Sequence, residues 1–165
     1  MSSFGYFSGT VTSIVDFWAG SEAPSGCYKL MTVQHSNGDI VNFVVSPTTY
    51  FVDNVMIRVG DAVIGFYDLN APAPLIYPPQ YRAIVMAKVI QNQNIKVDFF
   101  NNLLISSDST LKLIISPLTQ IIQENGQAFT ANLTNRNLIV VFGASTKSIP
   151  AQTVPYKIIV MCQSI

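Results

Sequence analysis

The sequence predicts an all-β protein built from two tandem copies of one unit. Residues 44–49 (VVSPTT) recur as residues 114–119 (IISPLT), 70 positions later. Residues 81–86 (YRAIVM) recur as residues 156–161 (YKIIVM), 75 positions later. Both blocks keep their order, so the second copy is expected to carry a five-residue insertion between them.

Short apolar runs predict strands throughout the chain. The runs are rich in Val, Ile, Phe and Tyr and are bounded by Gly, Pro, Asn, Asp and Ser, which is typical of β structure. No stretch has a helical pattern. The expected strands are residues 7–17, 27–35, 39–45, 49–57, 61–69 and 81–90 in the first copy, and 95–105, 110–115, 119–123, 137–143 and 156–162 in the second.

Turn residues set the ends of these strands. Asn37-Gly38 predicts a hairpin in which both turn positions adopt positive φ, and Ser107-Asp108 occupies the matching place in the second copy. Asn125-Gly126 predicts another turn within the insertion. The two copies are therefore expected to share a hairpin before their Ser-Pro blocks.

A Ser-Pro step interrupts an apolar run in each copy, at Ser46-Pro47 and Ser116-Pro117. Proline has no amide hydrogen for a sheet ladder, so each step predicts a bend where the chain changes sheet. Each unit is then expected to be a small β-barrel or sandwich. Its order of long strand, hairpin, bent strand and long loop before a final strand resembles the OB-type barrel.

The expected domains are residues 1–90 and 91–165, each a β unit near the lower size limit for an independent core. Residues 81–100 form an almost continuous apolar stretch. We expect this stretch to end one unit and begin the other, with no flexible linker between them.

The composition predicts a protein whose surface is covered. Only 11% of residues are charged and 49% are hydrophobic, with nine basic and nine acidic residues and no net charge. Soluble domains usually carry about 25% charged residues, and charge limits association. No apolar run reaches the about 18 residues that a membrane span requires. We therefore expect no membrane span, and copies of the same chain as partners.

Two proline-bearing, nearly uncharged loops, residues 70–79 and 144–155, precede the last strand of each copy. They are either recognition loops or stiff covers over an open barrel end. If they bind, their apolar side chains suit an apolar protein surface better than a charged ligand. The candidate interface residues in them are Leu75, Ile76, Tyr77 and Ile149.

The N-terminal aromatic residues Phe4, Tyr6 and Phe7 precede the first regular strand and are further interface candidates. Such a segment can add a strand to the sheet of a neighbouring copy and give head-to-tail association. The alternative is that these residues complete the protein's own barrel. Cys27 and Cys162 are either small hydrophobic residues or a cross-link that locks termini or joins subunits.

Residues 143–153 (GASTKSIPAQT), together with residues 75–81 (LIYPPQY), resemble segments of uncharacterised tandem-repeat β proteins of spore-forming bacteria. The resemblance spans most of the chain and implies a spore-surface or extracellular appendage location. It brings no activity and no functional residue. Residues 1–7 have no features of a Sec signal, so export by another route or a cytoplasmic location is expected.

No catalytic residue, metal site or cofactor is predicted. The single histidine, His35, lies near Ser36 and Asp39, but a solvated turn histidine is expected rather than a triad. Two cysteines without neighbouring histidines make no zinc site, and the carboxylates are scattered singly. The nine basic residues are spread evenly, whereas nucleic-acid binding requires clustered cations, so no nucleic acid is expected.

Three functions remain open from the sequence. The first is a non-enzymatic structural protein that self-assembles through β surfaces into a filament, appendage or surface layer. The second is a module that binds a protein or glycan with its twin proline-bearing loops. The third is an enzyme with a site made only of acidic residues, which no motif supports. The low charge and apolar loops favour the first.

Overall fold

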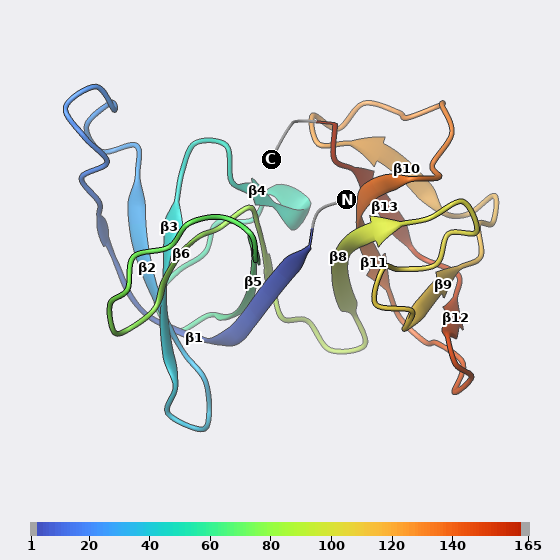
Figure 1. Cartoon of the computed structure of the whole chain (residues 1–165), viewed down its shortest axis with the longest axis horizontal. Helices are drawn as coiled ribbons and strands as arrows, with labels where there is room; N and C mark the ends of the chain where they lie inside the picture. The colour runs from blue at the N-terminus through green and yellow to red at the C-terminus, as the bar shows by residue number, and fades with distance from the viewer. Residues whose placement is uncertain (1–2, 163–165) are drawn as a thin grey trace. The chain divides into compact units, whose positions relative to one another are not determined.

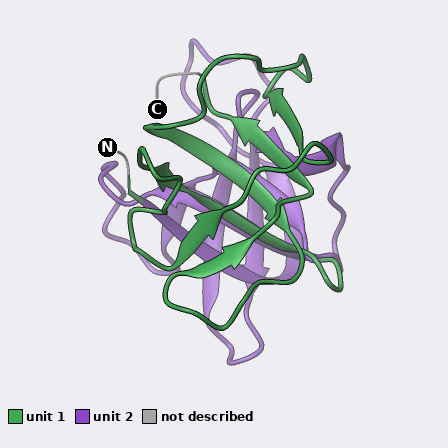
Figure 2. Ribbon diagram, turned by 90° about the vertical axis from the view of Figure 1, so that its right-hand side faces the viewer, with its two compact units in different colours: residues 1–3, 90–165 green, residues 4–89 purple. Residues whose placement is uncertain are grey.

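The computed structural model describes residues 3–162 and confirms an all-β protein. Its strands are arranged in two compact units (Figures 1 and 2). Phe4–Val89 forms the N-terminal unit, purple in Figure 2, and the chain from Ile90 onward forms the C-terminal unit, green in Figure 2. Each unit is described separately below.

The N-terminal unit is one sheet of seven strands in the order β4-β7-β5-β1-β2-β3-β6. Apart from the strands, it contains a short 3₁₀ turn at Val52–Asn54. The strands are β1 (Phe4–Asp16), β2 (Lys29–Gln34), β3 (Ile40–Val45), β4 (Tyr50–Phe51), β5 (Ala62–Asp68), β6 (Gln80–Arg82) and β7 (Val85–Lys88).

Two residues join the ends of this sheet. β6 runs parallel to β3, β7 runs antiparallel to β5, and only Ala83 and Ile84 separate β6 from β7. The Ala83 amide donates to the Val44 carbonyl (3.0 Å), and the Ile84 amide donates to the Phe66 carbonyl (2.8 Å). Hydrogen bonding therefore passes from β1 through β2, β3, the β6–β7 segment and β5 back to β1.

β1 pairs with two strands, β5 and β2, and changes from one to the other near its middle. Residues 4–10 pair with β5, and residues 10–16 pair with β2, with an irregularity between Val11 and Ser13. Gly9 lies at this change of partner. A Cβ there would come within 2.3 Å of the Gln34 carbonyl oxygen, so only glycine permits this close approach.

The core of the N-terminal unit lies between these strands. Phe43 is fully buried, and a Cβ on Gly65 would lie 2.6 Å from its ring, so the missing side chain of Gly65 makes room for the aromatic ring. Phe7, Val45 and Tyr67 are partly buried against this core. Its buried members are Val11, Met31, Val33, Val41, Phe43, Ile57, Val63, Ala83 and Met86.

The C-terminal unit repeats these pairings, but β8 and β9 are shorter than their counterparts β1 and β3. A four-stranded sheet has the order β10-β13-β11-β8, and β9 pairs in parallel with β12. Isolated bridges from Phe100 to Ser106 and from Ile105 to Lys112 connect β8 with β9. The strands are β8 (Asn94–Phe100), β9 (Leu111–Leu113), β10 (Gln120–Gln123), β11 (Arg136–Phe142), β12 (Ala151–Thr153) and β13 (Lys157–Val160).

The core of the C-terminal unit is aliphatic except for one aromatic ring, that of Phe100. Its buried members come from strands β8, β9, β11 and β13. They are Phe100, Leu111, Leu113, Leu138, Val140, Ile158 and Val160.

The strand pairings correct the register of the second repeated block. Tyr50 pairs with Val85 in one unit, and Gln120 pairs with Lys157 in the other. Val85 therefore corresponds to Lys157, 72 positions later, instead of the 75 inferred from the sequence. Tyr81, on β6, corresponds to Thr153 on β12. The sequence comparison matched Tyr81-Arg82 with Tyr156-Lys157 because the two pairs are alike. The strand pairings instead show which positions are structurally equivalent.

Most of the residues expected in the two cores are buried or partly buried. From the apolar runs we expect the two cores to include residues among Val45, Ile84 and Val85 and the residues aligned with them, Ile115, Ile159 and Val160. Val85, Ile159 and Val160 are fully buried, Val45 and Ile84 are partly buried, and Ile115 is 39% exposed. The expected set therefore includes core residues of both units, but Ile115 is not one of them, because it lies beyond the end of β9.

A hydrogen-bonded Ser-Pro-x-Thr turn follows β3. The bend expected at Ser46-Pro47 is therefore present, but the chain does not change sheet there, because β3 and β4 belong to the same sheet. The Ser46 amide donates to Thr49 Oγ1 (3.0 Å), and the Thr49 amide donates to the Ser46 carbonyl (3.1 Å). The buried Thr49 Oγ1 donates in turn to the carbonyl of Ala83 (2.8 Å). The turn is thereby fixed to the residue at which β6 passes into β7.

The same turn follows β9 in the C-terminal unit. The Ser116 amide donates to Thr119 Oγ1 (3.4 Å), and Thr119 Oγ1 donates to the Pro155 carbonyl (2.8 Å). Pro155 lies between β12 and β13, as Ala83 lies between β6 and β7. The two copies thus share one tertiary hydrogen bond as well as one sequence block.

Several expected elements differ from the structure. The predicted strand 49–57 is two residues of β4 followed by the 3₁₀ turn, and the predicted strand 95–105 ends at Phe100. β12, which lies in the second proline-bearing loop, was not predicted. Residues 81–100 are not continuous, because β7 ends at Lys88 and β8 begins at Asn94 after a turn.

The Asn37-Gly38 hairpin is confirmed, but with a different turn. Only Gly38 has a positive φ (95°), and its amide donates to the His35 carbonyl (2.9 Å). Ser36 and Asn37 are therefore the central turn residues, and glycine takes the left-handed position after them. The turn ending at Gly126 (φ 85°) is built in the same way.

Replacing Thr49 tests the contribution of its hydrogen bond to the Ala83 carbonyl, between β6 and β7. Thr49→Val keeps the shape of the side chain but leaves the Ser46 amide and Ala83 carbonyl without their hydroxyl partner. We expect a loss of about 1–3 kcal/mol in the free energy of unfolding, measured by urea denaturation. The exposed neighbour gives the control: Thr48→Val should change it by less than about 0.5 kcal/mol. Equal effects of the two substitutions would contradict this role.

Candidate functional site

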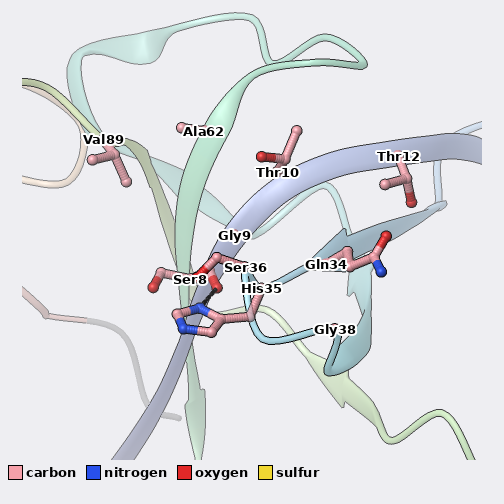
Figure 3. Close-up of a pocket in the computed structure, with 10 residues that line it drawn as sticks. All are labelled: Ser8, Gly9, Thr10, Thr12, Gln34, His35, Ser36, Gly38, Ala62 and Val89. Carbon is pink, nitrogen blue, oxygen red and sulfur yellow. Dashed lines mark hydrogen bonds between the residues drawn. The ribbon is translucent and has the colours of Figure 1, made fainter.

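An uncharged depression lies beside β1 in the N-terminal unit (Figure 3). Its volume is about 590 Å³. Hydroxyl, amide and imidazole groups line it, and neither a carboxylate nor a Lys or Arg side chain takes part. Its lining comes from β1, the β2–β3 hairpin, β5 and the end of the unit: Ser8, Gly9, Thr10, Thr12, Gln34, His35, Ser36, Gly38, Ala62 and Val89.

His35 connects the hairpin to β1. Its Nδ1 lies 2.9 Å from the Ser8 carbonyl oxygen, as the dashed line in Figure 3 marks. A carbonyl only accepts, so Nδ1 carries the hydrogen and donates it. The ring also contacts Phe7 edge-on, with centroids 6.1 Å apart.

The structure does not assemble a Ser-His-Asp triad around this histidine. Asp39 Oδ2 accepts a hydrogen bond from Asn37 Nδ2 (3.0 Å), and the Asp39 amide donates to Asn37 Oδ1 (2.9 Å). His35 Nδ1 is occupied by Ser8. These contacts belong to the hairpin turn and orient no nucleophile.

The corresponding region of the C-terminal unit carries charged side chains. By strand register, Gly9 corresponds to Asp98 and Gln34 corresponds to Ser107. Asp98 is buried and accepts hydrogen bonds from Ser107 Oγ (2.5 Å) and the Phe99 amide (2.8 Å). The depression around Gly9 is thus a feature that the two copies do not share.

Next to Asp98, a salt bridge joins Lys96 Nζ to Asp108 Oδ2 (2.6 Å). Burial raises the pKa of Asp108, but hydrogen bonds from Lys96, Ser106 and Thr110 outweigh this effect and hold the pKa well below its usual range. The carboxylate is therefore charged under all ordinary conditions. Its contacts stabilise the turn before β9.

The predicted N-terminal interface residues lie in the unit's own sheet. Phe4, Tyr6 and Phe7 belong to β1 and are opposite Asp68, Phe66 and Gly65 of β5. The expectation that these residues precede the first regular strand is therefore wrong, because they are the first residues of β1. Tyr6 is nonetheless 67% exposed, so its side chain is available at the surface.

The loop residues predicted to form an interface are exposed. Leu75 is fully exposed, Tyr77 is 81% exposed and Ile149 is 96% exposed; Ile76 is also exposed. Tyr77 and Ile149 precede cis prolines, and these stand two residues before β6 and one residue before β12, respectively. In the corrected register Pro78 corresponds to Pro150, so Tyr77 and Ile149 occupy equivalent places in their units.

One apolar surface was missed in the sequence analysis. Ile114, Ile115 and Leu118 are exposed near the Ser-Pro-x-Thr turn of the C-terminal unit, as are Val154 and Tyr156 beside β12 and β13. In the N-terminal unit, Thr48 and Arg82 hold the positions of Leu118 and Val154. Arg82 Nη2 lies 3.5 Å from Thr48 Oγ1, so this region is polar in one copy and apolar in the other.

Several aromatic rings of the N-terminal unit lie inside the fold. Phe43 and Phe66 are buried, and Tyr67 stacks on Tyr81 with centroids 3.9 Å apart. Burial, followed by the proximity of Tyr81, raises the pKa of Tyr67. These rings stabilise the unit and offer no exposed row of stacking faces.

The two cysteines are free and exposed. They therefore do not pack as small hydrophobic residues. In the described part of the chain, no group of three or more His, Cys, Asp or Glu side chains is placed to hold a metal ion. Among residues 3–162, no helix has the length and apolar character needed to cross a membrane.

Comparison of the chain with protein-family models, with curated proteins and with solved structures finds no match. The function must therefore be argued from the site residues themselves.

The charge of Asp108 predicts a pH-dependent contribution to stability. Its pKa is lowered in the folded state, so the contribution is complete above the ordinary value of 3.8 and is lost as the pH falls below it. Asp108→Asn should be less stable than the natural chain at pH 7, and the difference should shrink from about pH 4 downward. Urea denaturation across this range measures it.

The control for this prediction is Asp16→Asn, which removes the exposed Asp16–Lys29 salt bridge. Exposed pairs contribute little, so the free energy of unfolding should change by less than about 1 kcal/mol. A gap for Asp108→Asn that stays constant between pH 7 and about pH 2 would show that the charge of Asp108 has no special role.

Proposed function

We propose that this protein is a non-enzymatic structural subunit that self-assembles through β surfaces into a filament, appendage or surface layer. The observation that carries the proposal is the exposure of large apolar side chains at the tips of both proline-bearing loops, at Leu75, Tyr77 and Ile149. Burying one such side chain contributes about 1.5–3 kcal/mol. With no net charge to keep copies apart, these side chains favour association.

The equivalent places of Tyr77 and Ile149 support assembly by repetition. Each subunit then presents two related apolar tips, one from each unit. The tips differ in sequence, as does the region of Leu118 and Val154 compared with Thr48 and Arg82. Contacts between unlike surfaces are heterologous, and such contacts close into rings or continue as filaments.

Under the same proposal, each unit is an OB-type barrel that acts as a rigid building block. Support comes from the order β1-β2-β3-β6/β7-β5 of the N-terminal unit, with its parallel β3–β6 pair. A five-stranded Greek-key barrel of this order leaves short free edges. Assembly then depends on the loops and on any edge left open.

A spore-surface or extracellular appendage location completes the proposal. It rests on the resemblance of residues 75–81 and 143–153 to repeat proteins of spore-forming bacteria. The exposed thiols of Cys27 and Cys162 are available for disulfides between subunits in such an oxidising setting. Such cross-links would add covalent strength to contacts first made by the apolar tips.

Introducing negative charges at the loop tips tests whether these tips drive self-assembly. In Leu75→Asp/Ile149→Asp, burial of a charged tip is unfavourable, so assemblies larger than a dimer should be lost while the fold is kept. Electron microscopy and sedimentation velocity at matched concentrations measure the outcome. Met56→Asp, at another exposed apolar residue, should assemble as the natural chain does. A natural chain that remains monomeric at high concentration would overturn the proposal.

A second function, binding of a neutral glycan, is favoured by the depression beside β1. Its hydroxyl, amide and imidazole groups suit a ligand rich in hydroxyls and without charge. Titration of the full chain with neutral oligosaccharides, followed by NMR of the His35 ring, should then give saturable shifts that Thr10→Val weakens about tenfold. Lack of shifts at millimolar oligosaccharide would exclude this function. Thr110→Val, in the C-terminal unit, is the control.

A further inference from the structure

The register of β1 shows which way its backbone groups point. The Val11 amide donates to the Asp61 carbonyl (2.9 Å), on the side of β5. Because backbone groups alternate along a strand, Gly9, Phe7 and Gly5 also face β5, and residues 4, 6 and 8 face the opposite side. The bond from His35 Nδ1 to the Ser8 carbonyl lies on that opposite side and agrees with this assignment.

On that side, β1 has no partner strand before residue 10, where pairing with β2 begins. Within the described residues, no hydrogen bond joins the Tyr6 amide, the Tyr6 carbonyl or the Ser8 amide to another group. Residues 4–8 therefore form an open sheet edge, which we term the β1 edge. The Tyr6 side chain, in the middle of this edge, is 67% exposed.

The β1 edge lacks the features that usually prevent strands from pairing. Lysine, proline and bulges protect most natural edges. Residues 4–10 (FGYFSGT) contain no charge and no proline, and the irregularity of β1 lies beyond them, between Val11 and Ser13. The equivalent strand of the C-terminal unit, β8, carries Lys96 and Asp98 at the positions of Phe7 and Gly9.

We propose that the β1 edge binds the β1 edge of a second copy of this chain, antiparallel about a two-fold axis, with Tyr6 opposite the same residue of the second copy. The proposal rests on the function proposed above and names one of its contact surfaces. An antiparallel pair of identical strands is self-complementary: about the axis, the Tyr6 amide and carbonyl of each copy meet the Tyr6 carbonyl and amide of the other.

Charge and strand register favour a second copy of this chain as the partner of the β1 edge. Two uncharged edges approach without the repulsion that like charges directly opposite would cause. Tyr6 opposite Tyr6 is an aromatic cross-strand pair, and residue 4 then faces residue 8 of the other copy. The pairing stops at Ser8, because residues from Thr10 onward already pair with β2 and His35 holds the Ser8 carbonyl from the hairpin side.

A proline at position 6 tests pairing at the β1 edge without disrupting the fold of the unit. Tyr6→Pro removes an amide that faces away from β5, and an outward-facing edge position is where a strand tolerates proline. Tyr6→Val, the matched control, removes the ring but keeps the amide. In sedimentation velocity of the full chain, Tyr6→Pro should weaken dimerisation at least about tenfold relative to Tyr6→Val. Equal dimerisation of these two variants overturns the proposal.

A cross-linking experiment keeps the proposal testable if Tyr6→Pro fails to fold. In a chain that carries Cys27→Ser and Cys162→Ser, Tyr6→Cys should give a covalent dimer with a short bis-maleimide. Thr12→Cys places the thiol on the part of β1 that pairs with β2 and should remain monomeric. Failure of Tyr6→Cys to form the dimer, or equal cross-linking at residue 12, overturns the proposal.

The outcomes for the β1 edge and for the loops are distinguishable. If Leu75→Asp/Ile149→Asp removes large assemblies and Tyr6→Pro leaves dimerisation unchanged, the β1-edge proposal is wrong and the structural function stands. If the loop variant leaves dimers that Tyr6→Pro then dissociates, both are supported. A natural chain that is monomeric at high concentration overturns both.

Discussion

The hydrogen bond from the threonine of the Ser-Pro-x-Thr turn is the contact on which each unit depends. Thr49 Oγ1 reaches the Ala83 carbonyl and Thr119 Oγ1 reaches the Pro155 carbonyl, both at 2.8 Å. Each carbonyl lies where the last segment of the unit leaves one strand partner for another. The bond therefore fixes this change of partner, and through it the hydrogen bonding that leads back to the first strand.

The sequence predicted this contact in part. The two Ser-Pro blocks were found because their residues recur, and the expected bends are present. The partner carbonyls were not predictable, because they lie 34 and 36 residues away and any residue supplies a carbonyl. The register error has the same cause: a Tyr-Lys/Arg pair recurs locally, whereas register is set by strands such as β12 that are too short to show a pattern.

The candidate site was predicted where it depends on composition and missed where it depends on register. Leu75, Tyr77 and Ile149 are exposed, as apolar residues in proline-bearing loops were expected to be. The open β1 edge follows from where β2 stops pairing, and the depression follows from the close approach of Gly9 to the Gln34 carbonyl. Neither leaves a mark in the sequence, since Gly9 resembles any other strand glycine.

The two copies differ in surface polarity at two places, and the difference has the opposite sign at each. The two units of a subunit therefore offer different surfaces to the proposed assembly. The first strand of the C-terminal unit carries Lys96 and Asp98, held within the unit by Asp108 and Ser107. In the N-terminal unit, residues 4–10 of β1 are uncharged, and residues 4–8 form an open sheet edge. Near the Ser-Pro-x-Thr turn the difference reverses: the C-terminal unit is apolar and the N-terminal unit is polar. A subunit that associates through its β1 edge in one unit and through apolar tips and turns elsewhere has two independent kinds of contact. An isologous contact alone ends at a dimer, and a heterologous contact alone permits chains, so together they permit chains that pair side by side.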